Sequence, residues 1–417
     1  MWSKAGSYNP LIAMKTLRRA ALVCVLALGH SLPARTQTLP SEPLSLADGK
    51  VTIGGDVSAT VGPDDTGFFN YSDYDHSTLR TFRVDLTAAL NVSPHLAVLS
   101  EVRTENGGLP RAYALYLRIR PWTGHAFDIQ AGRVPPTFGA FARRIYPADN
   151  LLIGYPLAYQ YLTSLRADSL PLNADELLSM RGRGWLSNFS LGNLTPSNGL
   201  PLASGFRWDT GVQVHAAAEL LDATASVTTG TISNPLFTDD NSGRQIAGRL
   251  SVHPVPGLIV GASAARGPFV TSTAARGAVG DGRDGEFTQT ALGGDVEYSR
   301  DYYLVRAETV FSEWKVPAVG APVIDVPLRA LGTYVEGRYK IRPGLYVAAR
   351  VDHLGFSDVT GSQGPQTWDA PVTRVEVGGG YSIQRNLLLK VSCQRNTRDG
   401  GKVTSLNLVS AQMVYWF

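Results

Sequence analysis

The stretch LNLVSAQMVYWF, at Leu406–Phe417, ends on five apolar or aromatic residues. Met413, Tyr415 and Phe417 alternate within it, so they lie on one side of an extended chain. The termini of soluble domains are usually solvated. An apolar terminus therefore indicates burial, either in a protein core or in lipid, and the rest of the sequence decides between the two.

A period of two residues runs through most of the sequence. In VTIGGDVSATV, at Val51–Val61, Val51, Ile53 and Val57 fall on one face, and Asp56 falls on the other. The same alternation recurs in the stretches 81–92, 112–120, 333–341 and 372–383. In the second of these it places Tyr113 on the apolar face. Such alternation predicts strands with one apolar and one polar face.

Short and long connections alternate between these strands. Tight turns fall near residues 93–95, 121–124, 218–219, 254–257, 299–301, 342–344 and 384–386. Long polar or Gly-rich segments fall at 62–78, 105–110, 135–206, 230–243, 267–286, 313–327, 357–370 and 397–402. We therefore predict an all-β, antiparallel transmembrane barrel of about sixteen strands, with about fourteen or eighteen as alternatives, short periplasmic turns and long extracellular loops.

The charges on the polar faces decide which face points outward. A barrel of about sixteen strands is too wide for side chains to fill, so an apolar interior would be empty. We predict apolar residues toward outer-membrane lipid and a wet, charged lumen. The wall charges singled out are Arg83, Asp85, Arg118, Arg120, Glu336, Arg338, Arg374 and Glu376. Aromatic residues near the short turns predict a girdle at the membrane surface: Trp122, Phe127, Tyr298, Tyr303, Tyr339 and Tyr381.

The N-terminal part has the features of a secretory signal peptide. Basic residues after Met14 precede an apolar run and small residues, so we predict a signal peptide over 1–34, a linker over 35–50 and the barrel over 51–417. Removal of the leader lowers the formal net charge from +3 to −1, so the basic pI gives no reason to expect nucleic-acid binding. One cysteine, Cys393, then remains, which excludes an intrachain disulfide.

Two stretches resemble those of bacterial outer-membrane porins. AGRVPPTFGAF, at Ala131–Phe141, resembles the Gly-basic-x-x-Pro-x-x-Gly stretch of the phosphate-selective and related substrate-specific porins of sixteen strands. Met413, Tyr415 and Phe417 resemble the C-terminal assembly signal of such barrels. The resemblance implies location in the outer membrane of a Gram-negative-type bacterium, recognition by the barrel-assembly machinery, and a homotrimer. It also implies that the third long loop, 135–206, folds into the lumen and forms a constriction at roughly 138–190.

The side chains of that loop support two hypotheses about the solute. In the first hypothesis, anions are attracted by Arg143, Arg144 and Arg166. The alternative is that these arginines pair with acids such as Asp149. In the second hypothesis, sugars are bound by a surface of four tyrosines, and the alternative is that these tyrosines pack the loop onto the barrel wall. They are Tyr146, Tyr155, Tyr159 and Tyr161. Charges of both signs on the strands argue against phosphate specificity.

We predict a porin for passive diffusion of small hydrophilic solutes, with anions as candidates. The histidines are dispersed and match no metal-ligand spacing, so we expect no metal, no other cofactor and no catalytic residue. The alternative function is a structural or hydrolase-type barrel without an open pore. His353, on the outward-facing period, is its one named candidate.

Overall fold

The computed structural model describes residues 40–71, 77–122 and 124–417. The chain separates into two units, Met1–Pro40 and Ser41–Phe417, and the second contains every element below. The predicted signal peptide and linker residues 35–39 lie outside the described residues. Within the predicted linker, Leu44–Leu46 forms a short strand, β1.

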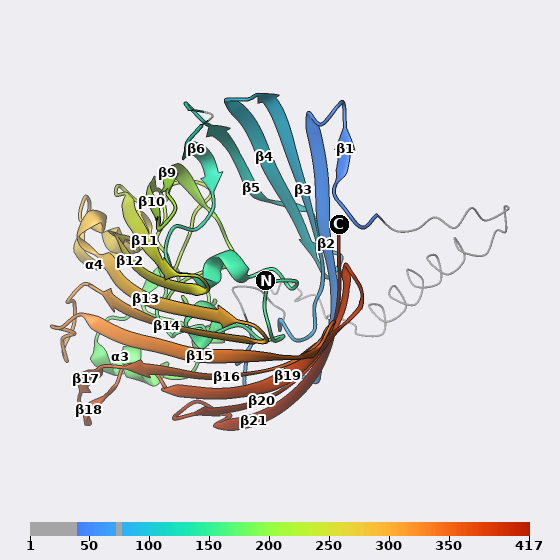
Figure 1. Cartoon of the computed structure of the whole chain (residues 1–417). Coiled ribbons are helices and arrows are strands. Elements are labelled where there is room, and N and C mark those ends of the chain that lie inside the picture. The colour runs from blue at the N-terminus through green and yellow to red at the C-terminus, as the bar shows by residue number, and fades with distance from the viewer. Residues whose placement is uncertain (1–39, 72–76, 123) are drawn as a thin grey trace, which may run out of the picture. The chain divides into compact units, whose positions relative to one another are not determined.

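The second unit is a closed antiparallel barrel (Figure 1). Its sheet has 17 strands, of which β1 pairs with the rim and the other 16 form the ring. The ring consists of β2 (Val51–Val61), β3 (Phe82–Ser93), β4 (Leu96–Glu105), β5 (Arg111–Ile119), β6 (Ala126–Val134), β9 (Asp209–Ala217), β10 (Leu221–Thr228), β11 (Gln245–Val255), β12 (Leu258–Pro268), β13 (Thr288–Arg300), β14 (Tyr303–Trp314), β15 (Leu328–Arg342), β16 (Leu345–Phe356), β19 (Val372–Gln384), β20 (Leu387–Arg398) and β21 (Ser405–Trp416). The predicted fold class and strand number are confirmed.

The last strand closes the ring against the first. β21 pairs with β2 from Val61↔Ala411 to Asp56↔Trp416, and Phe417 exchanges both backbone hydrogen bonds with Gly55 at 3.0 Å. β1 continues along the same edge of β2, where Leu46 lies opposite Val51. An ideal Cβ at Gly55 would lie 2.8 Å from the Phe417 ring, so the glycine leaves room for the terminal aromatic side chain.

Strand chemistry explains which face meets lipid. Alternate positions carry exposed aliphatic side chains around the ring, for example Leu86, Leu250, Val335 and Val409. Five of the six predicted girdle residues are exposed beside the short turns: Trp122, Tyr298, Tyr303, Tyr339 and Tyr381. A closed barrel with this outer surface is a transmembrane outer-membrane barrel.

The period of two fails within β5. The register of β4 and β5 shifts between Glu101 and Val102, which is a β-bulge. Tyr113 consequently points inward, where it is 5% exposed and its hydroxyl donates to the Gly205 carbonyl at 2.8 Å. The predicted apolar-face position of Tyr113 is therefore wrong, because the bulge reverses the alternation.

The large hydrophobic core lies inside the ring, and the third long loop, residues 135–208, contributes nearly half of its residues. The green segment in Figure 1 runs between the strands. This loop carries η1 (Phe141–Arg144), α2 (Leu157–Gln160), β7 (Ser169–Leu170), α3 (Ala174–Ser179), η2 (Gly184–Leu186) and β8 (Leu191–Gly192). Other long loops carry α4 (Ser272–Val279), η3 (Asp284–Glu286), β17 (Asp358–Gly361) and β18 (Gly364–Thr367). Among the described residues, no helix is long and apolar enough to cross a membrane.

Candidate functional site

A segment of the third loop crosses the lumen, and we refer to residues 139–154 as the strap. Its first turn is fixed by Glu308 of β14, which accepts hydrogen bonds from the amides of Ala140 at 2.8 Å and Phe141 at 3.2 Å. The Tyr159 hydroxyl donates to the same carboxylate at 2.5 Å. Burial raises the pKa of the Tyr159 phenol well above its usual range, so it remains a donor. Gly139 has φ +78°, and a Cβ there would overlap that hydroxyl.

The far end of the strap is fixed at Gly154. Its amide donates to Glu376 of β19 at 2.9 Å, and its carbonyl accepts from Arg350 of β16 at 2.7 Å. Arg350 and Glu376 are also paired with each other at 2.8 Å. A Cβ at Gly154 would overlap the amide of Gln394 and lie 2.6 Å from Glu376. The glycine therefore allows the close approach of the strap to the wall.

The middle of the strap rests on Lys390 of β20. Its ammonium donates to the carbonyls of Pro147 at 2.6 Å, Asn150 at 3.1 Å and Leu152 at 3.1 Å. The side chain is 1% exposed. A buried ammonium needs its three donors satisfied, and here the strap main chain satisfies them.

Three strap side chains reach different parts of the wall. Arg143, which is exposed, donates to the Thr224 hydroxyl of β10 at 3.2 Å. Arg144 pairs with Glu297 of β13. Tyr146 donates to Glu101 of β4 at 2.6 Å. The strap therefore spans the lumen from β14 to β4, with Arg143, Arg144 and the exposed Asp149 available to water.

The remaining predicted loop residues lie away from that water. Arg166 is fully buried; it forms a bidentate pair with Asp168 at 2.9 Å and donates to the carbonyls of Ser187 and Thr195. Tyr155 and Tyr159 are 5% and 1% exposed. These placements differ from the expected pore-lining positions, because the loop is thick enough to have an interior of its own.

The wall charges divide into two groups. Arg83 and Asp85 of β3 form a buried network with Glu101 and Arg103 of β4, in which Asp85 accepts from both arginines at 2.5 Å. Arg118 and Arg338 are half-buried on lumenal faces. Arg120 lies beyond the end of β5 in an exposed turn, and not on the wall as expected, because the strand ends at Ile119.

The other wall charges are covered by the loop. Glu336 is 1% exposed and pairs with Arg306 at 3.4 Å and Arg350 at 3.5 Å. Arg374 and Glu376 are both 0% exposed. Arg374 donates to the carbonyls of Tyr155 at 2.9 Å and Phe69 at 2.7 Å. Arg374 and Glu376 hold the loop, whereas the sequence suggested that all three charges face a wet lumen.

Of the residues that position the strap, sequence reasoning singled out only Glu376, and as a charge that lines the lumen. Glu308, Arg350 and Lys390 all fall on the polar period of their strands, but so do many charges that contact no loop. The strap itself carries a recognisable sequence feature at these contacts. Gly139 and Gly154 lie at its two ends, where charged side chains of the wall meet the main chain.

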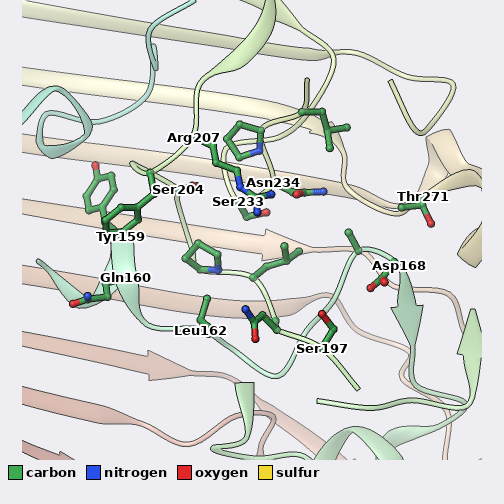
Figure 2. A pocket seen from close by; sticks show the side chains of 18 of the residues that line it. Tyr159, Gln160, Leu162, Asp168, Ser197, Ser204, Arg207, Ser233, Asn234 and Thr271 are labelled. Atoms are coloured by element: carbon green, nitrogen blue, oxygen red, sulfur yellow. The ribbon is translucent and has the colours of Figure 1, made fainter. Parts of the chain in front are cut away.

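A cavity of about 290 Å³ lies outside the strap, between the third loop and the loop after β10 (Figure 2). In Figure 2, Arg207 projects beside Ser233 and Asn234, and Asp168 lies on the far side of the cavity. Within the described ranges, no group of three or more His, Cys, Asp or Glu side chains could hold a metal ion. His353 is exposed on the outer face, with Nδ1 2.9 Å from the Thr373 hydroxyl.

Neither a protein-family model nor a curated protein sequence matches the chain. Solved structures do match over nearly the whole barrel. The anion-selective porin of Comamonas acidovorans is 10% identical with a TM-score of 0.54, covering 88% of this chain and 99% of its own. The outer membrane channel DcaP of Acinetobacter baumannii is 12% identical with a TM-score of 0.53, covering 90% and 100%.

OmpT, an outer membrane protein of Vibrio cholerae, is 12% identical with a TM-score of 0.52, covering 89% of this chain and 99% of its own. A trimer form of OmpT matches with a TM-score of 0.50, at 14% identity and with coverage of 88% and 99%. At such identities the likeness shows the fold: this chain is similar to outer-membrane porins in its barrel.

Proposed function

We propose that this chain is an outer-membrane porin through which small hydrophilic solutes diffuse passively, with anions favoured over cations. The observation that carries the proposal is the strap. It is held to the barrel wall through its main chain, and it presents Arg143, Arg144 and Asp149 toward the lumen. A fixed segment with water-accessible charges is what a selectivity constriction requires.

Arg143 is the residue that gives the anion preference in this proposal. Arg144 and Asp149 bring one positive and one negative charge, and Arg144 is paired with Glu297. Arg143 donates to a neutral hydroxyl, so its charge is less compensated by contact. The Comamonas porin is described as anion-selective, which agrees with this assignment but does not carry it.

The proposal also includes the partners expected from the sequence. Outer-membrane lipid contacts the exposed aliphatic belt, and the barrel-assembly machinery recognises Met413, Tyr415 and Phe417. The trimer form of OmpT supports a homotrimer here. No cofactor takes part, and a channel without catalytic activity is favoured over the structural or hydrolase-type alternative, because the charged side chains gather at the strap.

The test is the reversal potential of the refolded protein in planar bilayers under a salt gradient. Arg143→Glu changes the local charge by two units. Since two unit charges at 4 Å interact by about 1 kcal/mol in water, we expect the anion-to-cation permeability ratio to fall on the order of tenfold. Arg385→Glu, at an 80% exposed side chain in the turn after β19, makes the same charge change outside the lumen and should leave the ratio unchanged. A folded protein that conducts nothing, or equal effects of both variants, would contradict the proposal.

A further inference from the structure

Three of the long loops meet at one place and border a cavity of about 390 Å³, which we call the loop pocket. Its described lining comes from Thr66 and Phe68 in the first long loop, from residues 180–196 of the third, and from residues 398–403 at the end of β20 and in the loop before β21. The strap contributes none of these residues. The volume lies within the range of small-molecule sites, about 300–1,000 Å³.

Arg398, the last residue of β20, holds the three loops together. Its guanidinium donates to at least one oxygen of each loop: the carbonyls of Gly67 at 3.1 Å, Gly400 at 3.1 Å and Val403 at 3.0 Å, and the hydroxyl of Tyr161 at 3.5 Å. The side chain is 7% exposed. Because one buried group binds all three loops, the lining of the pocket is fixed before a ligand arrives, and less conformational freedom is lost on binding.

Two aromatic rings in the lining form a platform. The rings of Phe68 and Trp185 are stacked, with their centroids 3.8 Å apart and 6° between their planes, and both side chains are half-buried. Phe68 has φ +56°, which is an outlier for a bulky residue. Phe69, the next residue, is fully buried, with the Arg398 guanidinium 4.8 Å from its ring. Backbone strain that holds an aromatic ring at a half-exposed position favours a binding role over core packing.

Positive charge lines the pocket beside this platform. The described lining holds three basic residues, Arg183, Arg398 and Lys402, and no acidic one. Arg398 interacts electrostatically with the buried carboxylate of Asp369, so its charge is partly balanced. Arg183 and Lys402 are exposed, and within the described chain neither side chain forms a hydrogen bond or an ion pair. The charge of these two residues is therefore available to a ligand.

Neutral polar side chains complete the lining. Asn188 and Thr66 are exposed and border the pocket. Their amide and hydroxyl groups both donate and accept hydrogen bonds. Sugar hydroxyls need such partners, and the C–H face of a sugar ring packs on an aromatic ring. The combination of an aromatic platform, neutral polar groups and free cations points to a ligand that has rings, hydroxyls and acids together.

We propose that the loop pocket binds a short acidic saccharide. Its rings pack on Phe68 and Trp185, and its carboxylates pair with Arg183 and Lys402. The guanidinium can donate two parallel hydrogen bonds to one carboxylate. A neutral saccharide would leave both cations without a partner, and an inorganic anion would leave the platform bare. The inference goes beyond the proposed function, because binding at the loops needs no passage through the barrel.

The experiment is calorimetric titration of the refolded barrel in detergent with digalacturonate. Its dimethyl ester, which has the rings without the charges, and glutarate, which has the charges without the rings, serve as comparisons. We expect digalacturonate to bind about tenfold more tightly than either, since the aromatic contact and the charge-assisted hydrogen bonds act together only in this ligand.

Two variants separate the platform from the charges. Arg183→Gln should weaken digalacturonate binding about fivefold and leave the ester unchanged, because an exposed ion pair contributes modestly. Trp185→Leu should weaken the binding of both digalacturonate and the ester about fivefold and leave glutarate unchanged. Arg385→Gln, in the short turn after β19 at the opposite end of the barrel, is the matched control and should change nothing.

Equal binding of digalacturonate and glutarate, or of digalacturonate and its ester, would overturn the inference, as would an unchanged digalacturonate affinity in Arg183→Gln. If Trp185→Leu does not fold, the comparison of digalacturonate with glutarate on the wild type still tests the platform. Conductance of the same preparation separates the two proposals: a barrel that binds digalacturonate and does not conduct refutes the porin alone, and a barrel that conducts without binding it refutes the loop pocket alone.

Discussion

Buried charges in this barrel hold main-chain groups. Lys390 donates to three strap carbonyls, Glu308 accepts from two strap amides, and Arg374 donates to the carbonyls of Tyr155 and Phe69. The alternation of the strands predicts that these residues point inward. It cannot predict that a loop distant in sequence covers them, because the period describes only the strand on which each residue lies.

Replacement of Lys390 by Met should loosen the strap without removing the barrel. Three buried carbonyls would lose their donor, at a cost of about 1–3 kcal/mol each where water cannot replace it. We expect noisier single-channel currents and faster proteolysis within the strap. Lys340→Met, at an exposed lysine near the end of β15, is the matched control. Quiet currents in Lys390→Met would show that the strap does not depend on the ammonium.

At the scale of the element, the sequence predicts the course of the third loop but not which of its residues are exposed. Its length and its resemblance to porin loops predict a segment folded into the lumen, and in the structure residues 139–154 of this loop contact Glu308, Glu376 and Lys390 of the strands. The exposed residues were not separable from the buried ones by sequence, since Arg143 and Arg166 look alike there. Only the fold shows that Asp168 and two carbonyls enclose Arg166.

The strap should also respond to pH through Asp149. Partial removal from bulk water raises the pKa of the Asp149 carboxyl, although the charges of Arg306 and Arg144 act in the opposite direction. As the pH falls, this aspartate gains its proton before an aspartate of ordinary pKa does, and the strap loses a negative charge. We therefore expect anion selectivity to rise on mild acidification.

Reversal potentials measured across a pH series check this, with Asp149→Asn as the comparison. The variant should be more anion-selective than the wild type at neutral pH and should lack the first part of the acid-induced change. An identical pH series for the two proteins would assign the titration to other carboxylates.

At the scale of the whole molecule, the architecture was predictable because it repeats a local rule. The alternation is read separately in each strand, and each turn is recognised by its own short polar sequence. A wrong prediction for one strand therefore does not affect the prediction for the next. The bulge beside Glu101 is an exception that changes a side chain's face. It reversed the side chain of Tyr113 without any change in composition that would mark it, and Tyr113 lines a cavity at the ends of β4 and β5.

Closure of the ring should depend on the space left by Gly55. A side chain at this position would overlap the Phe417 ring, which lies 2.8 Å from an ideal Cβ. We expect Gly55→Val to lower the folded fraction after refolding, with an overpacking cost of about 1–3 kcal/mol. Gly294→Val, where an added Cβ meets open space, is the control. Electrophoretic mobility with and without heating measures the folded fraction, and equal fractions for the two variants would contradict the expectation.

The way the strap is held has a consequence for how such a pore can change over time. Wall residues that form hydrogen bonds with main-chain amides and carbonyls can make the same contacts whatever side chains the strap carries. Between Gly139 and Gly154, the identity of an exposed residue is therefore almost independent of the attachment. New permeation properties can arise by single substitutions along the strap, while the scaffold that supports it stays the same.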